Sequence, residues 1–141
     1  MSHTWFLVAD SSRARLYEVE KRNAPFVEVE VFEHPEGRLH EGDLVSDRPG
    51  SDGGSLGQGR RVLDDKVSAR EQEDIRFATQ LAERLEAARK AGDLDRLVLV
   101  APPAFLGLLR DKLGKEVMAR VSNQVDKNLV QQPPEVLREY L

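Results

Sequence analysis

The sequence predicts a single α/β domain built around a mixed five-stranded sheet. Three observations predict it: successive β-type segments between Trp5 and Val31, an amphipathic segment after Ser68, and a continuous apolar run at Leu97–Ala101. Strands joined by short turns pair in antiparallel fashion, whereas strands joined through a helix pair in parallel. The order of the elements therefore predicts three antiparallel strands, followed by helical crossovers to parallel strands.

The first three strands are predicted from residue type and spacing. Trp5–Ala9 is a short apolar run that ends at turn-forming residues 10–12, as a central strand does. Arg13–Glu20 contains several β-favouring residues and is predicted to be its hairpin partner. In the third strand valines alternate with glutamates, so one face should lie in the core and the other in water. We expect the core-facing residues to be Val27, Val29 and Val31, and the water-facing residues to be Glu28 and Glu30.

An amphipathic helix is predicted after residue 68. Ser68 and Glu71 have the spacing of a capping box, in which the two residues satisfy each other's free backbone amides. Basic residues followed by Gly92 indicate where the helix ends. Apolar residues recur at spacings of three and four and define one buried stripe. The stripe consists of Ile75, Ala78, Leu81, Ala82, Leu85 and Ala88.

The last third of the chain is predicted to alternate strands and helices. Leu97–Ala101 has the uninterrupted apolar character of a parallel strand covered on both faces. Pro102 and Pro103 open a second helix, because proline is tolerated in a first helical turn. A weaker strand is expected around Val117–Val121, and a short terminal helix from Pro133. This order corresponds to the ribonuclease H-like arrangement, with helices on both faces of the sheet.

Length and composition limit the classes of protein to which the chain can belong. The 141 residues suffice for one domain, 1–141, with a core of its own. The absence of cysteine and of a signal-like or membrane-spanning segment leads us to expect a cytoplasmic protein with no membrane partner. A net charge of −4 argues against a dedicated DNA-binding protein, since duplex binding depends on neutralising phosphates. The sequence gives no indication of oligomeric state.

A glycine-rich segment, Asp47–Arg61, interrupts this scaffold. It holds five of the ten glycines and one apolar side chain, Leu56. A segment of this composition buries too little surface to offset the entropy lost on ordering. We therefore expect a mobile loop that presents Gln58 between two glycines and ahead of two arginines, unless the segment is only a flexible connection.

The histidines before this loop do not predict a metal centre. His34 and His40 are flanked by acidic residues, but their spacing matches no metal-binding motif. We expect them to lie in a solvated loop, and we expect no metal and no cofactor.

With these segments in place, the chain resembles the bacterial host-attachment protein family over nearly its whole length. The matching sequence segments lie in both the amino-terminal and carboxyl-terminal parts of the chain as well as around the loop. They comprise Val8–Glu18, His34–Gly37, Asp43–Gly50, Phe77–Ala78, Asp95–Pro103, Phe105–Arg110, Asp126–Leu129 and the capped helix. That family in turn looks like the middle domain of archaeal and eukaryotic peptide-chain release factors. In those proteins a loop after the third strand carries Gly-Gly-Gln to the ribosome's peptidyl-transferase centre and promotes hydrolysis of peptidyl-tRNA.

The resemblance implies a ribosome or tRNA partner and assigns roles to loop residues. Gly57 and Gln58 match the last two positions of the release-factor motif, whereas Leu56 stands at the position of its first glycine. Gln58 is therefore the candidate catalytic residue, and the incomplete motif leaves open whether the chain is an enzyme. The residues implied to contact RNA are Gly57, Gly59, Arg60, Arg61 and Arg48.

Two other classes of function stay open at this point. A non-enzymatic interaction protein, which affects host attachment indirectly, requires no catalytic residue. A metal-dependent nuclease, suggested by analogy with the fold, requires several convergent carboxylates. Asp10 is the one acid at a central strand end, and we predict that it forms a turn instead.

Overall fold

The computed structural model shows an α/β domain with one five-stranded sheet in the order β3-β2-β1-β4-β5. It describes residues 3–34 and 56–141, with side chains described for 3–34 and 69–141. The strands are β1 Thr4–Ala9, β2 Arg13–Val19, β3 Val27–Glu33, β4 Arg96–Val100 and β5 Val121–Val125. The helices are α2 Leu56–Lys90, α3 Pro103–Lys112, α4 Lys115–Met118 and the 3-10 helix η1 Pro134–Tyr140.

The pairing of the strands confirms the predicted mixed sheet. β1 pairs with β2, and β2 with β3, in antiparallel fashion, as short connections require. β1 pairs in parallel with β4, and β4 in parallel with β5, as helical crossovers require. β1 lies at the centre of the sheet, and each of its residues is buried, which explains why its sequence is apolar without alternation.

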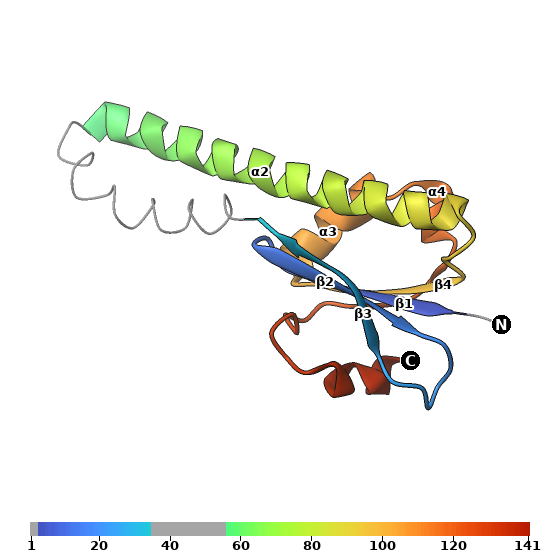
Figure 1. Ribbon diagram of the computed structural model, residues 1–141. Helices are drawn as coiled ribbons and strands as arrows, with labels where there is room; N and C mark the ends of the chain where they lie inside the picture. The colour runs from blue at the N-terminus through green and yellow to red at the C-terminus, as the bar shows by residue number, and fades with distance from the viewer. Residues whose placement is uncertain (1–2, 35–55) are drawn as a thin grey trace.

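The two faces of the sheet are covered differently (Figure 1). α2, α3 and α4 pack on one face and form the larger hydrophobic cluster with alternate residues of the strands. The opposite face is covered by residues 129–141, which include η1, and forms the second cluster. The expectation of helices on both faces is therefore correct only if the 3-10 helix is counted, because every α-helix described lies on the first face.

The carboxyl-terminal half of α2 confirms the predicted buried stripe except at Ile75, which is half-buried; Phe77, which the stripe did not include, is buried instead. Phe77, Leu81 and Leu85 are at most 1% exposed and contribute to the larger cluster. The helix ends in a Schellman motif, because the amide of Asp93 donates to the Ala88 carbonyl at 2.9 Å and that of Gly92 to the Arg89 carbonyl at 3.0 Å. Gly92 has a φ of +84°, a conformation that glycine adopts without strain.

The start of α2 differs from the prediction. The helix begins at Leu56, so Ser68 and Glu71 lie inside it and do not form a capping box. Residues 60–67 contain neither glycine nor proline, and extending an existing helix is much easier than nucleating one. Continuation through Gly57 and Gly59 costs about 1 kcal/mol for each glycine. Residues 56–61 of the predicted loop are therefore helical, while residues 47–55 lie outside the described part of the chain.

The prediction for the faces of β3 is wrong. Val27, Val29 and Val31 are 55%, 36% and 44% exposed, and the buried residue of the strand is Phe32. β3 is an edge strand, and its register with β2 shifts between Leu16 and Tyr17. Such an irregularity breaks the period of two along the strand. Glu30, expected in water, faces α2 and accepts a hydrogen bond from the Arg84 guanidinium at 2.6 Å.

The last strand also lies later than predicted. Residues 115–118 form the short helix α4, and β5 covers the polar residues 121–125. β5 is the other edge of the sheet, and its three middle residues are exposed. Its polar sequence therefore fits a strand with little core contact, which hydropathy does not detect.

Replacing Leu81 by aspartate should unfold the domain or destabilise it by about 3 kcal/mol or more, because it buries an unpaired charge. Leu81 is 1% exposed within the larger cluster. Gln80→Asp is the matched control, since Gln80 is exposed on the same helix. Thermal denaturation should show a large loss for Leu81→Asp and a small change for the control. Similar melting temperatures for the two variants would show that this face of α2 is not buried.

Gly92→Ala should destabilise the protein by roughly 1–2 kcal/mol, because a side chain disfavours the left-handed conformation. No atom lies within 4 Å of a Cβ built at Gly92, so the effect is conformational and not steric. Gly114→Ala is the control, because Gly114 has a φ of −74° and equally open surroundings. Chemical denaturation measures both; equal stability of the two variants would contradict the assigned role of Gly92.

Candidate functional site

The amino-terminal half of α2 forms an arm that projects from the domain. The buried residues described on α2 lie between Phe77 and Ala88. At 1.5 Å per residue, the tip at Leu56 lies about 30 Å along the helix axis from Phe77. Figure 1 shows this part of α2 extending past the end of the sheet. We call residues 56–70 the arm.

The predicted site residues lie at the tip of the arm. Residues 57–61, the Gly-Gln-Gly segment and the two arginines, form part of the first two turns of α2. Gly57, Gln58, Gly59, Arg60 and Arg61 are thus brought together on one short helical segment, whereas Arg48 lies outside the described residues. The first four amides of a helix have no partner within it, and they give that end a partial positive charge. The sequence places two arginines at this end of the helix.

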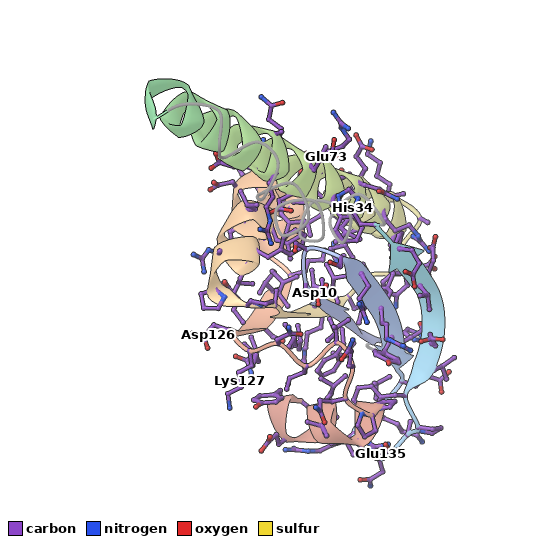
Figure 2. The ribbon with its side chains drawn as sticks, turned by 90° about the vertical axis from the view of Figure 1, so that its left-hand side faces the viewer. Asp10, His34, Glu73, Asp126, Lys127 and Glu135 are labelled. Atoms are coloured by element: carbon purple, nitrogen blue, oxygen red, sulfur yellow. The ribbon has the colours of Figure 1, made fainter. Side chains whose placement is uncertain are left out.

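Side chains at the base of the arm hold it against the sheet. His34 lies directly after β3, is only 6% exposed, and stacks on Phe77 with ring centroids 4.7 Å apart and planes at 5°. Its Nε2 lies 3.9 Å from Oε1 of Glu73, whose Oε2 accepts a hydrogen bond from Arg76 at 2.8 Å. Figure 2 shows His34 and Glu73 next to each other where α2 crosses the end of β3. His34 is a buried packing residue, so the prediction that it lies in a solvated loop is wrong.

A polar cavity of about 330 Å³ opens near the base of the arm. It lies where β1 and β4 end, the edge at which ligands bind in many open α/β sheets. Its walls come from the β1–β2 turn, α2, the start of α3 and the segment after β5. The lining residues are Asp10, Ser11, Ser12, Arg13, Asp74, Pro102, Ala104, Phe105 and Asn128.

Asp10 has the structural role predicted from the sequence. Its Oδ1 accepts hydrogen bonds from the amides of Ser12 at 2.8 Å and Arg13 at 2.9 Å, which fixes the β1–β2 turn. In the described part of the chain, no group of three or more His, Asp or Glu side chains is arranged to hold a metal ion. Two carboxylates, Asp10 and Asp74, and one guanidinium, Arg13, line the cavity, which leaves one negative charge in excess. The cavity is therefore polar without a strong excess of either charge.

The residues of this cavity other than Asp10 were not anticipated from the sequence. Asp74, Phe105 and Asn128 are far apart along the chain and meet only through the strand order. One signal was available, because the carboxyl ends of parallel strands lie at the same edge of a sheet. The residues that follow β1, β4 and β5 could have been grouped on that basis.

The fold and the site define a class: an α/β protein with a mixed five-stranded sheet and a projecting helical arm. The chain belongs to the family described as "protein required for attachment to host cells", whose sequence model matches residues 5–141. No curated protein matches the chain. Within residues 3–34 and 56–141, no helix has the length and apolar character needed to cross a membrane.

Asp10→Ala should destabilise the protein by about 1–3 kcal/mol, because the amides of Ser12 and Arg13 lose their shared acceptor. Asp10→Asn is the matched variant, since its side-chain oxygen can still accept both bonds. Urea denaturation should therefore place Asp10→Asn closer to the unmodified protein than Asp10→Ala. An equal loss in the two variants would show that the charge of Asp10, and not its acceptor geometry, holds the turn.

Proposed function

We propose that this chain is a stand-alone release-factor-like domain that acts at the ribosome or on tRNA through the tip of its arm. The observation that carries the proposal is the position of Gly57, Gln58 and Gly59 at the amino-terminal end of a 35-residue helix. That helix places them about 30 Å along its axis from the packed core. A group carried in this way can enter a narrow channel of a large partner while the domain stays outside.

The charge distribution supports an RNA partner at this end of the molecule. The chain as a whole carries a net charge of −4, so a uniformly basic RNA-binding surface is not available. Arg60 and Arg61 are adjacent at the tip, where the helix dipole is also positive. Phosphate oxygens bind readily at the free amides of a helix amino terminus. We therefore expect the arm to contact RNA through its tip.

Gln58 is the residue proposed to take part in hydrolysis. A glutamine amide both donates and accepts hydrogen bonds, so it can orient a water molecule toward the ester carbonyl of peptidyl-tRNA. Attack forms the bond from water oxygen to the carbonyl carbon, the bond to the ribose oxygen breaks, and that oxygen receives a proton. Leu56, at the position of the first motif glycine, favours a second candidate: a non-enzymatic interaction protein that binds through the same tip and affects host attachment indirectly.

Two finer assignments accompany this proposal. We assign the domain to the ribonuclease H-like class, a proposal supported by the strand order β3-β2-β1-β4-β5 with β2 antiparallel to β1. We also place the protein in the cytoplasm, since a ribosome or tRNA partner requires that location.

Replacing Arg60 and Arg61 together by alanine should weaken binding to ribosomes or tRNA. It should also make the salt dependence weaker: the magnitude of the slope of log affinity against log salt concentration should fall by up to about two, roughly one for each lost phosphate contact. Co-sedimentation with ribosomes and tRNA binding, each over a salt series, measure both effects. The matched control is Lys112→Ala with Lys115→Ala, which removes two exposed cations from outside the arm. An equal loss in the control would show that net charge, and not the arm, governs binding.

Gln58→Ala should leave affinity nearly unchanged and abolish release of the peptide from peptidyl-tRNA, since a water-orienting group acts in the transition state. A peptidyl-tRNA release assay measures this directly. Binding by the unmodified protein without release would favour the non-enzymatic candidate. If the protein neither binds nor hydrolyses, the proposed function is wrong.

A further inference from the structure

A second cavity lies at the end of the sheet away from the arm, where strands β1 and β4 begin. Its volume is about 340 Å³, and it is lined by the ends of β1, β2 and β4, the β2–β3 turn and the end of η1. Thr4 pairs with Val19 of β2 and with Arg96 of β4, so these three residues form one row across the sheet. The residues lining the cavity are Thr4, Val19, Glu20, Lys21, Arg22, Arg96 and Leu141.

The cavity gathers positive charge that is unpaired among the residues whose side chains are described. Lys21, Arg22 and Arg96 line it, and Glu20 is the acidic side chain among the described lining residues. None of the three cationic side chains forms a hydrogen bond or ion pair with the residues whose side chains are described. An excess of positive charge persists even when an α-carboxylate at Leu141 is counted.

The basic side chains among the described residues fall into two groups. Lys21, Arg22 and Arg96 are exposed and form no ion pair with the described residues, as is also true of Lys112 and Lys115. Arg15, Arg84 and Arg89 each bind a glutamate at 3.1 Å or less. What distinguishes the cavity is that three cations and one carboxylate line it together, an excess of positive charge that favours an anionic ligand.

The floor of the cavity adds a hydrogen-bond donor. Thr4 is 7% exposed, and its hydroxyl has no hydrogen-bond partner among residues 3–34 and 69–141. The hydroxyl oxygen is not among the buried side-chain atoms that lack a partner, so it is open to the cavity and available to donate to an oxygen of a ligand. The position of Thr4 between Val19 and Arg96 places this hydroxyl beside one of the cations.

The turn that carries two of the cations is held in place by η1. Arg138 donates to the carbonyl of Arg22 at 2.9 Å and to that of Ala24 at 2.7 Å. Its guanidinium also lies 5.1 Å from the centre of the Phe26 ring. The amide of Ala24 donates to the carbonyl of Lys21 at 2.9 Å, which closes the turn. A site fixed before binding loses less entropy when the ligand arrives.

We propose that this cavity binds a phosphoryl group through Lys21, Arg22 and Arg96, with the Thr4 hydroxyl as an additional donor. A phosphoryl group presents several oxygen acceptors. The two guanidinium groups, the ammonium group and the hydroxyl that line the cavity are all hydrogen-bond donors, so they suit such a group. The volume is at the lower end of the range for small-ligand sites, which suits a phosphorylated small molecule such as a mononucleotide. The same chemistry is offered by a phosphate of RNA. The site lies away from the arm and does not depend on the function proposed for it.

Calorimetric titration with AMP, adenosine and inorganic phosphate tests the site. AMP should bind and adenosine should not, because the nucleoside lacks the phosphoryl group. Arg96→Gln should weaken AMP binding about tenfold or more, as expected for a lost charge-assisted contact, and Thr4→Val should weaken it by roughly fivefold. The matched control, Lys112→Gln, removes an exposed cation from outside the cavity and should have little effect.

A short single-stranded RNA without terminal phosphates distinguishes the two sources of the phosphoryl group. Binding of AMP and inorganic phosphate assigns the site to a small phosphorylated compound. If the RNA binds but AMP and inorganic phosphate do not, and Arg96→Gln abolishes that binding, the site recognises a backbone phosphate. This outcome supports the role of the same cavity residues. Thermal denaturation verifies that each variant is folded. Equal binding of AMP and adenosine, or binding unchanged by Arg96→Gln, would overturn the proposal, as would no binding by any of these probes.

Discussion

The packing of the second half of α2 on the sheet is the constraint on which the rest of the structure depends. Phe77, Leu81 and Leu85 contact a surface formed by alternate residues of the central strands, including Leu7 and Leu99. Burial of large apolar side chains contributes about 1.5–3 kcal/mol each, so this short stretch of helix supplies much of the stability of the first face. From this anchored stretch, the amino-terminal part of the helix extends past the end of the sheet (Figure 1).

This division of α2 connects the core to the candidate functional site. The half between Phe77 and Ala88 is buried, whereas the arm carries polar and glycine residues that a core does not require. His34 packs on Phe77 at the junction, and therefore couples the end of β3 to the point where the arm leaves the sheet. Core packing therefore determines the direction in which the arm leaves the sheet. The residues at its tip do not contribute to that packing, so they can change without loss of the core.

The sequence predicted those elements whose burial is uniform or strictly periodic. β1 and β4 are covered on both faces, and the second half of α2 is amphipathic, so hydropathy identified all three. Both edge strands were placed less well, because β3 contains a register shift and β5 has few core contacts. The start of α2 was missed because helix propagation overrides glycine at Gly57 and Gly59. The turn role of Asp10 was predictable from the sequence, and the role of the tip residues stays a prediction, whereas the two cavities depend on strand order.

The central claim is that the packed half of α2 holds the domain together while the arm makes the functional contact. Hydrogen exchange of the backbone amides, measured with and without ribosomes, tests it most directly. Amides between Phe77 and Ala88 should be protected to the same extent in both conditions, since their burial is internal. Amides of residues 56–68 should exchange more slowly when ribosomes are present. Unchanged exchange in the arm, with new protection elsewhere on the domain or none at all, would contradict the account.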